Sequence, residues 1–238
     1  MPAHKSTPEE IRQRFDSDVE RFSNLETGQS ATIDAPLSLE LIARVAGGVG
    51  PNATALLDIG CGAGNYTLKL LQHLPLQSVT LCDLSRPMLD RAVERISAAA
   101  PDVSVTAMQC DIRSAALPEA AFDVAVAAAA LHHLRGDEEW RHVFAAVFRA
   151  LRPGGSFWIS DLVTHQSPDV QGVMWQRYGE YLASLKGLEY RDRVFAYIEA
   201  EDTPRPLFWQ LELLARTGFR QLEVLHKNSV FAAFGGIK

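Results

Sequence analysis

The chain has 238 residues and a formal net charge of −6, with 47% hydrophobic and 22% charged residues. This length suits one α/β domain with a small added lid, and the composition is that of an ordinary soluble globular protein. No apolar run approaches the ~20 residues of a membrane span, and the start of the chain lacks a signal-peptide core, so no membrane contact and a cytoplasmic location are expected. Nucleic acid is disfavoured but not excluded as a partner, because binding phosphate backbones demands clustered Lys and Arg, and no long basic run occurs.

Two helices are predicted before the first strand. Thr7-Pro8-Glu9-Glu10 is a capping box that precedes apolar residues at helical spacing, and a second helix is expected over residues 38–46. These helices define a predicted N-terminal cap or lid over residues 1–50. Phe15 and Phe22 either close over an active site or form an ordinary packing stripe, and their spacing leaves both readings open.

Strand and helix signals then alternate, which indicates a parallel sheet with helical crossovers. Strands are expected at residues 55–59, 78–82, 104–109, 122–127 and 156–160, and helices at 65–74, 86–99 and 137–151. Residues 51–163 are therefore predicted to form the core domain.

The last third of the chain departs from this rhythm. Helices are expected over residues 170–185 and 191–200, and a third is expected from Thr203-Pro204 to near Arg216. Two short strands, at 222–225 and 229–234, are expected to form an antiparallel hairpin. The prediction is thus a helical insertion over residues 164–217, which shapes an acceptor pocket, and a C-terminal hairpin over 218–238 that completes the sheet.

The most informative segment is 54–64, Thr-Ala-Leu-Leu-Asp-Ile-Gly-Cys-Gly-Ala-Gly. Glycines at alternate positions after a buried strand let the backbone turn sharply and approach a ligand closely. A dinucleotide-binding fold uses the spacing Gly-x-Gly-x-x-Gly, which this chain lacks, so a nicotinamide-dependent dehydrogenase is disfavoured.

Five segments, in order, resemble class I S-adenosylmethionine-dependent methyltransferases over roughly residues 53–162. They are Asp58-Ile-Gly-Cys-Gly-Ala-Gly64, Asp83 in Cys-Asp-Leu-Ser-Arg-Pro-Met-Leu, Cys110-Asp111-Ile112, the strand from Phe122 that ends in His-His-Leu134, and Leu151-Arg-Pro-Gly-Gly-Ser-Phe. The resemblance implies a doubly wound, seven-stranded Rossmann-like sheet with an antiparallel C-terminal strand, N-terminal helices and a helical insertion after the fifth strand.

The resemblance also implies S-adenosyl-L-methionine as the cofactor. Asp83 is expected to accept the ribose hydroxyls, and Asp111 is expected either to face the adenine or to cap the following segment. Asp58 either holds the ammonium group of the ligand or braces the loop. The full set of expected cofactor contacts is Asp58, Gly60, Gly62, Gly64, Asp83, Leu84, Asp111, Ile112, Ala127 and Ala128.

His132, His133 and Asp161 are the candidate catalytic residues, because they follow the fourth and fifth strands where a methyl acceptor would arrive. A neutral imidazole can take a proton from the acceptor, but structural packing of the histidines is an equal alternative. No metal-binding pattern is recognised. The three cysteines at strand ends, Cys61, Cys82 and Cys110, are interpreted as small buried residues, with a thiol site as the alternative.

The predicted function is methyl transfer to a small-molecule acceptor by in-line SN2 displacement, which gives S-adenosylhomocysteine. Two alternatives stay open: a tRNA wobble-uridine enzyme that makes or uses carboxy-S-adenosylmethionine, which Arg193 loosely favours, and a non-catalytic cofactor-binding partner protein. The acceptor and its methylated atom are unidentified at this stage, and a homodimer is left open.

Overall fold

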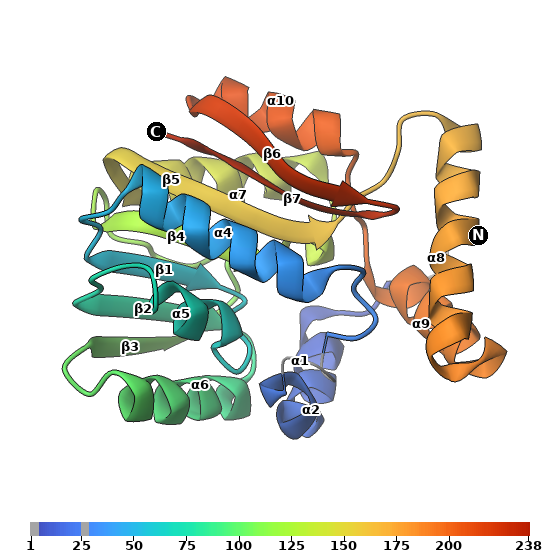
Figure 1. The fold of residues 1–238 in the computed structure, drawn as a ribbon, viewed down its shortest axis with the longest axis horizontal. Helices are drawn as coiled ribbons and strands as arrows, with labels where there is room; N and C mark the ends of the chain where they lie inside the picture. The colour runs from blue at the N-terminus through green and yellow to red at the C-terminus, as the bar shows by residue number, and fades with distance from the viewer. Residues whose placement is uncertain (1–4, 25–28) are drawn as a thin grey trace.

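A seven-stranded sheet forms the centre of the molecule (Figure 1). The computed structural model describes residues 5–24 and 29–238. The strand order is β3-β2-β1-β4-β5-β7-β6, in which the first five strands are parallel and β7 runs antiparallel between β5 and β6. This confirms the predicted fold class. The strands are β1 (Ala55–Ile59), β2 (Ser78–Asp83), β3 (Ser104–Gln109), β4 (Phe122–Ala128), β5 (Leu151–Leu162), β6 (Arg220–Asn228) and β7 (Phe231–Ile237).

Helices cover both faces of the sheet. One face packs against α4 (Ala35–Val49), α5 (Asn65–Leu70) and α6 (Arg86–Ala99), and the other packs against α7 (Asp137–Ala150) and α10 (Leu207–Thr217), as Figure 1 shows. All five residues of β1 are buried, as expected of a central parallel strand covered on both sides.

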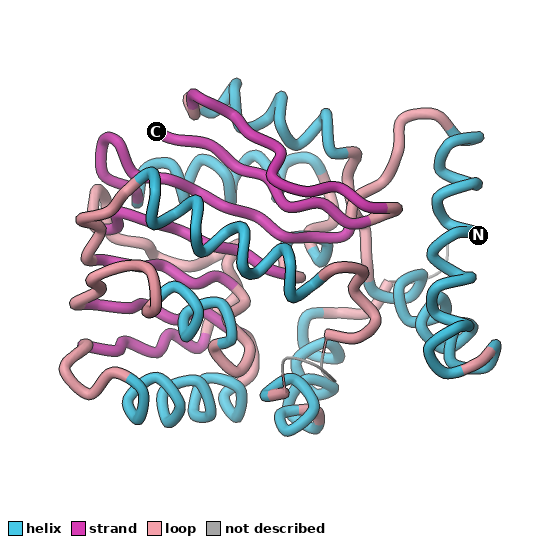
Figure 2. The backbone as a smooth tube through the Cα atoms, in the orientation of Figure 1, coloured by secondary structure: helices cyan, strands magenta, loops and turns pink. Residues whose placement is uncertain are grey.

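The remaining helices lie beyond the carboxyl ends of the parallel strands. They are α1 (Pro8–Ser17), α2 (Val19–Ser23), α8 (Pro168–Lys186) and α9 (Leu188–Glu201), and Figure 2 shows them beside the same edge of the sheet. Aromatic contacts join α8 to α9, with Trp175 stacked on Phe195 at 4.5 Å between ring centroids. The described start of the chain is attached to α9, because the Ser6 amide donates to the Ala200 carbonyl at 3.0 Å. None of the helices in the described ranges is long and apolar enough to cross a membrane.

Two predicted helices have different bounds in the structure. The helix expected at 38–46 begins at Ala35 and continues through Gly47-Gly48 to Val49, because burial of its apolar face outweighs the cost of about 1 kcal/mol for each helical glycine. It therefore packs on the sheet rather than with the cap. The helix expected at 65–74 ends at Leu70, after which 3₁₀-type hydrogen bonds from Gln72 and His73 tighten the turn.

The segments before β5 and α10 also differ from expectation. Leu151 already pairs with Phe122, and the Pro-Gly-Gly sequence forms an irregularity inside β5 before regular pairing resumes at Ser156. The third helix of the insertion begins at Leu207, not at Thr203-Pro204. The backbone and hydroxyl of Thr203 are used in tertiary hydrogen bonds, which prevents that residue from capping a helix.

Candidate active site

The glycine loop crosses the carboxyl edge of the sheet between β1 and α5. Its three glycines adopt left-handed backbone conformations, with φ of +64° at Gly60, +50° at Gly62 and +81° at Gly64. A Cβ atom on Gly60 would lie 2.5 Å from the Cβ of Ala130, whereas one on Gly62 would meet nothing within 4 Å. Gly60 is thus needed for packing against the turn after β4, and Gly62 leaves open space at the rim of a cavity.

Asp83 fixes this loop from the neighbouring strand. Its Oδ2 accepts a hydrogen bond from the Gly62 amide at 2.9 Å, and its Oδ1 accepts one from the Ser85 amide at 2.8 Å. Burial raises the pKa of Asp83, although the backbone amides that donate to it favour the ionised carboxylate. The residue lines the cavity, and each oxygen keeps a lone pair for a ligand.

Asp58 lies deeper, at the end of β1. The Thr67 hydroxyl donates to its Oδ2 at 2.7 Å, and only 1% of the residue is exposed. Burial raises the pKa of Asp58 to about 7. The contact with Thr67 ties β1 to α5, which supports the bracing role, while contact with a ligand ammonium stays a prediction.

Asp111 already has a cationic partner. The Arg113 guanidinium donates to both of its oxygens, with Nε 2.9 Å from Oδ1 and 3.0 Å from Oδ2. Burial opposes ionisation, but the hydrogen bonds from Arg113 lower the pKa of Asp111. The carboxylate also accepts from the Arg113 amide, so it closes a turn rather than capping a helix. Both residues line the cavity beside Ile112.

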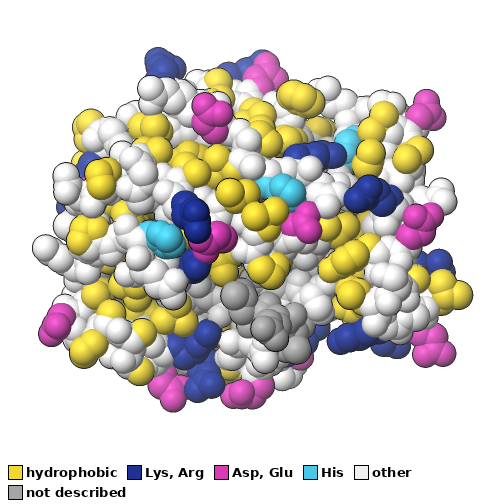
Figure 3. Space-filling model, in the orientation of Figure 1, with side chains coloured by type: hydrophobic (Ala, Val, Ile, Leu, Met, Phe, Trp, Pro, Cys, Tyr) yellow, Lys and Arg dark blue, Asp and Glu magenta, His cyan; other side chains and the backbone are white. Residues whose placement is uncertain are grey.

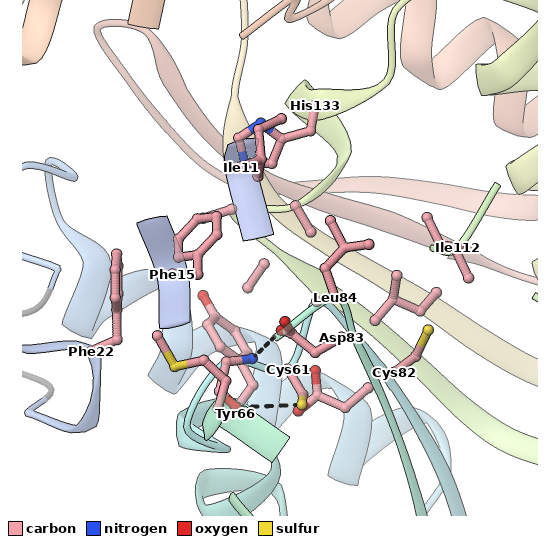
Figure 4. Close-up of a pocket in the computed structure, with 18 of the residues that line it drawn as sticks. Ile11, Phe15, Phe22, Cys61, Tyr66, Cys82, Asp83, Leu84, Ile112 and His133 are labelled. Carbon is pink, nitrogen blue, oxygen red and sulfur yellow. Dashed lines mark hydrogen bonds between the residues drawn. The ribbon is translucent and has the colours of Figure 1, made fainter. Parts of the chain in front are cut away.

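These groups surround a cavity of about 190 Å³ (Figure 4). Leu84, Ile112 and Ala128 line it, as expected. Ala127 and Gly64, which were also predicted to contact the cofactor, are not among the residues that line this cavity. Ala127 is fully buried in the core beneath the sheet, and a Cβ on Gly64 would lie 3.2 Å from the Cβ of Ala92, so Gly64 serves the packing of the loop on α6.

The N-terminal helices cover this cavity. Phe15 from α1 and Phe22 from α2 face it with ring centroids 5.4 Å apart, opposite Asp83 and Leu84 in Figure 4. The side-chain amide of Asn65 donates to the Phe22 carbonyl at 3.0 Å, which connects α2 directly to the helix after the glycine loop. The two phenylalanines are therefore part of the wall of the cavity.

A second cavity, of about 460 Å³, adjoins the first and shares Phe15, Phe22, Tyr66 and Ala128 with it. Its wall is formed by α1, α2, α8, α9 and the ends of β4, β5 and β7. Seven aromatic side chains line it: Phe15, Phe22, Tyr66, Tyr178, Tyr190, Tyr197 and Phe231. Arg14, Arg21 and Arg193 bring cationic groups to the same wall.

His132 and Asp161 form a buried pair beside the second cavity. His132 Nδ1 contacts Asp161 Oδ1, and the other oxygen of Asp161 accepts from the Leu131 amide at 2.9 Å. Burial opposes the charged imidazolium, but the carboxylates of Asp161 and Asp202 outweigh it and raise the pKa of His132 to about 9. At neutral pH His132 is therefore a cation in this arrangement, which makes it unsuited to act as a base.

His133 has a different environment. It lines the first cavity, with its ring edge-on to Phe15 at 6.1 Å between centroids. Burial and the nearby charge of His132 hold its pKa well below the usual range, so its imidazole is neutral. Of the two predicted histidines, His133 has the protonation state of a base, and its catalytic role stays a prediction.

Asp202 is the main residue that sequence reasoning missed. It follows α9 and is 5% exposed, with Oδ1 3.3 Å from His133 Nδ1 and 3.7 Å from His132 Nε2. The Thr203 amide holds it there by donating to the His132 carbonyl at 2.7 Å. No sequence motif includes Asp202, because only the folding of α9 back onto the sheet edge brings it to the histidines.

The three cysteines lie around the first cavity. Cys61, Cys82 and Cys110 all line the first cavity as free thiols. Cys82 and Cys110 are in contact, with their sulfur atoms 2.8 Å apart, and Cys61 lies across the cavity wall on the glycine loop. Cys61 and Cys82 are buried, as expected, and Cys110 is half-buried. The contact between Cys82 and Cys110 follows from the alignment of β2 with β3.

The lining of the first cavity has the features of a nucleoside-binding site in an α/β fold. Space opens at Gly62, the Asp83 carboxylate has acceptor capacity at the end of β2, and apolar residues line the opposite wall. An acidic residue after the second strand is suited to ribose hydroxyls in α/β nucleoside-binding folds. This fold, with a glycine loop after β1 and a carboxylate at the end of β2, is that of the class I S-adenosylmethionine-dependent methyltransferases.

Comparison with known proteins agrees. Residues 56–155 match the model of a methyltransferase domain. The chain is 35% identical over 120 residues to an uncharacterised methyltransferase of Mycobacterium tuberculosis and 32% identical over 174 residues to the 27-O-demethylrifamycin SV methyltransferase of Amycolatopsis mediterranei. These matches cover 50% and 69% of this chain, and 55% and 62% of the relatives' own lengths.

A solved structure with the same fold is human N-acetylserotonin methyltransferase in complex with its cofactor. The match has a TM-score of 0.59 and 17% identity, and it covers 95% of this chain and 56% of that one. At this identity the likeness concerns the fold alone. With the sequence matches, it places the chain in the class I S-adenosylmethionine-dependent methyltransferase family.

Proposed function

We propose that this protein transfers a methyl group from S-adenosyl-L-methionine to a small-molecule acceptor bound in the second cavity. The observation that carries the proposal is the junction of the two cavities. The glycine loop and Asp83 lie on one side, and an aromatic pocket opens on the other, with Tyr66 and Ala128 shared between them. The similarity to the 27-O-demethylrifamycin SV methyltransferase supports a small-molecule acceptor.

The residues of the chain would bind and orient the reactants. Gly62 and Asp83 would hold the cofactor, Leu84 and Ile112 would contact its base, and the aromatic wall would exclude water from the acceptor. The bound cofactor supplies an electrophilic methyl group on a sulfonium, so alignment and desolvation are expected to dominate the rate. His133, which is neutral, would receive a proton if the acceptor arrives protonated.

The charge distribution supports a small acceptor over a nucleic acid. On the face shown in Figure 3, basic side chains stand in small separate groups with acidic ones among them. The total charge of −6 adds to this argument. A phosphate backbone would need a continuous basic track.

The test begins with native mass spectrometry of the purified protein, followed by denaturation and identification of any released small molecule. S-adenosylmethionine or S-adenosylhomocysteine supports the proposal, and formation of S-adenosylhomocysteine with a panel of phenolic and enolic acceptors then completes it. A carboxylated analogue of the cofactor favours the wobble-uridine alternative. A protein that binds S-adenosylhomocysteine in calorimetry but transfers no methyl group to any acceptor, tRNA included, is the non-catalytic alternative.

A further inference from the structure

Three potential metal-ligating atoms meet where the two cavities join. His132, His133 and Asp202 each offer one such atom, and the three lie within 4.8 Å of one another. Asp202 Oδ1 is 3.3 Å from His133 Nδ1 and 3.7 Å from His132 Nε2. Zinc bonds of ~2.0–2.2 Å in a tetrahedral arrangement separate neighbouring ligand atoms by about 3.3–3.5 Å, so the two distances from Asp202 Oδ1 are close to those around a bound ion.

Polar atoms of His133 and Asp202 lack hydrogen-bond partners within the described residues. Both ring nitrogens of His133 and Oδ1 of Asp202 are shielded from solvent, and within the described part of the chain none has a hydrogen-bond partner. The contact between them has no hydrogen-bond geometry despite its short distance. Each unsatisfied buried polar group costs roughly 1–3 kcal/mol, and a cation between these atoms would remove that cost.

His132, the third potential ligand, is oriented by Asp161, which does not belong to the cluster. Asp161 contacts His132 Nδ1, and its own position is fixed by the amides of Leu131 and Leu162 at 2.9 and 2.7 Å. This contact leaves Nε2 of His132 as the atom directed at Asp202, and an ion bound there would displace the proton that this nitrogen carries in the ion-free protein. A carboxylate on the far nitrogen of a ligating histidine is the usual outer partner in metal sites.

We propose that His132, His133 and Asp202 form a binding site for a divalent transition-metal ion such as Zn²⁺, with one coordination position open. Two histidines and a carboxylate are a ligand set of catalytic zinc, which keeps a further position for water or substrate. His132 and Asp202 line the second cavity and His133 the first, so the open position faces the junction of the two. An oxygen atom of a small molecule in the second cavity is the group suited to that position.

This site was not foreseen from the sequence, from which no metal was expected. Two adjacent histidines do not by themselves form a metal-binding pattern, and the carboxylate that completes the set comes from the end of α9. The proposal concerns binding of the ion and does not depend on methyl transfer. Its failure would leave the proposed function unchanged. Its success would exclude His133 as a proton acceptor, because an imidazole that binds the ion through one nitrogen carries its proton on the other.

The experiment uses the full-length protein after treatment with a chelator, titrated with Zn²⁺ in a calorimeter. We expect one equivalent of Zn²⁺ per chain. Asp202→Asn and His133→Gln should each weaken binding by at least about tenfold, and Asp161→Asn by about 10- to 100-fold, as for other outer-shell partners. His142→Ala is the matched control, since that histidine is exposed on α7, and it should bind as the unmodified protein does.

Substitution with Co²⁺ provides a second measurement. A four- or five-coordinate site absorbs strongly in the visible range, whereas hydrated or loosely bound Co²⁺ does not. Far-ultraviolet circular dichroism shows which variants are folded. If one of the two ligand variants, Asp202→Asn or His133→Gln, does not fold, the other still tests the proposal.

The proposal is wrong if no stoichiometric binding occurs, or if Asp202→Asn and His133→Gln both bind as tightly as the unmodified chain. It is also wrong if binding is lost in Cys82→Ser and the Co²⁺ form shows thiolate charge-transfer bands. In that case the ion lies on the Cys82–Cys110 pair instead.

Discussion

The amide of Gly62 donates a hydrogen bond to Asp83 Oδ2 at 2.9 Å, and this contact links the glycine loop to the end of the next strand. Oδ1 of the same carboxylate holds the Ser85 amide at the start of α6. Asp83 therefore orders two backbone segments of the cavity before any ligand binds. The residue expected to contact ribose is also the one that shapes the loop around it.

Replacement of Asp83 by Asn should weaken the binding of S-adenosylhomocysteine by tenfold or more. An amide group has only one acceptor oxygen, so one of the two backbone amides loses its partner, and each such charged hydrogen bond contributes about 1.5–3 kcal/mol. Isothermal titration calorimetry measures the change. Asp90→Asn, an exposed carboxylate on α6, is the control. Unchanged affinity in Asp83→Asn would show that Asp83 does not contribute to cofactor binding.

The two glycines at the rim should respond differently to alanine. Both have positive φ, which costs an L-residue roughly 1–2 kcal/mol, but only Gly60→Ala also forces a methyl group to within 2.5 Å of Ala130. We expect Gly60→Ala to lower the free energy of unfolding by about 1–3 kcal/mol more than Gly62→Ala does. Urea denaturation of both variants tests this, and equal losses would contradict the packing argument.

A bulkier side chain at Gly62 should act on the ligand instead. The space beside Gly62 belongs to the cavity, so Gly62→Val should abolish binding of S-adenosylhomocysteine while leaving a folded protein. Calorimetry and circular dichroism on the same sample distinguish the two effects. Full affinity in this variant would show that the cofactor does not approach the loop.

Asp58 gives a pH dependence of stability. Its pKa is about 7 in the folded protein and near 3.8 in the unfolded chain, so the folded state holds the proton more tightly. Its contribution to stability is complete below about pH 4 and is lost as the pH rises towards 7. Each pKa unit corresponds to about 1.4 kcal/mol, so the loss amounts to a few kcal/mol.

Asp58→Asn, which cannot ionise, should lack this part of the pH dependence. Urea denaturation of the ligand-free protein and the variant between pH 4 and 8 gives the difference directly. Other buried carboxylates contribute equally to both curves and cancel. Parallel curves would mean that Asp58 is ionised in the folded state at all of these pH values.

The helices α1 and α2 should control release of the cofactor. Phe15 and Phe22 contact each other and form one wall of the first cavity. The double replacement Phe15→Ala/Phe22→Ala should raise the dissociation rate of S-adenosylhomocysteine by about tenfold or more, because the wall loses two large apolar side chains. Stopped-flow measurements test this, with Phe208→Ala on α10, which is 70% exposed, as the control. An unchanged rate would make the aromatic pair a packing stripe.

Sequence reasoning was most successful where the signal is local. The strand at Ala55–Ile59 and the helix at Arg86–Ala99 have the bounds that were predicted, because a short aliphatic run, a serine cap and a proline in the first turn each act over a few residues. The predicted bounds of α5 and α10 were wrong. For α10 the cause is a contact with a residue far away in the sequence. At Thr203 a tertiary contact with His132 takes the groups that a local cap would have used.

The sequence by itself determined the order of the sheet elements, the glycine loop and the carboxylates at the ends of β1, β2 and β3, because residues that follow parallel strands must meet at one edge. Only the tertiary structure decided that Gly64 packs on α6, that Ala127 is buried in the core and that Asp111 is paired with Arg113. It also decided that Asp202 lies beside His132 and His133. These positions depend on contacts between segments far apart in the chain, and the packing of α9 and the N-terminal helices against the sheet edge has no signature in local spacing.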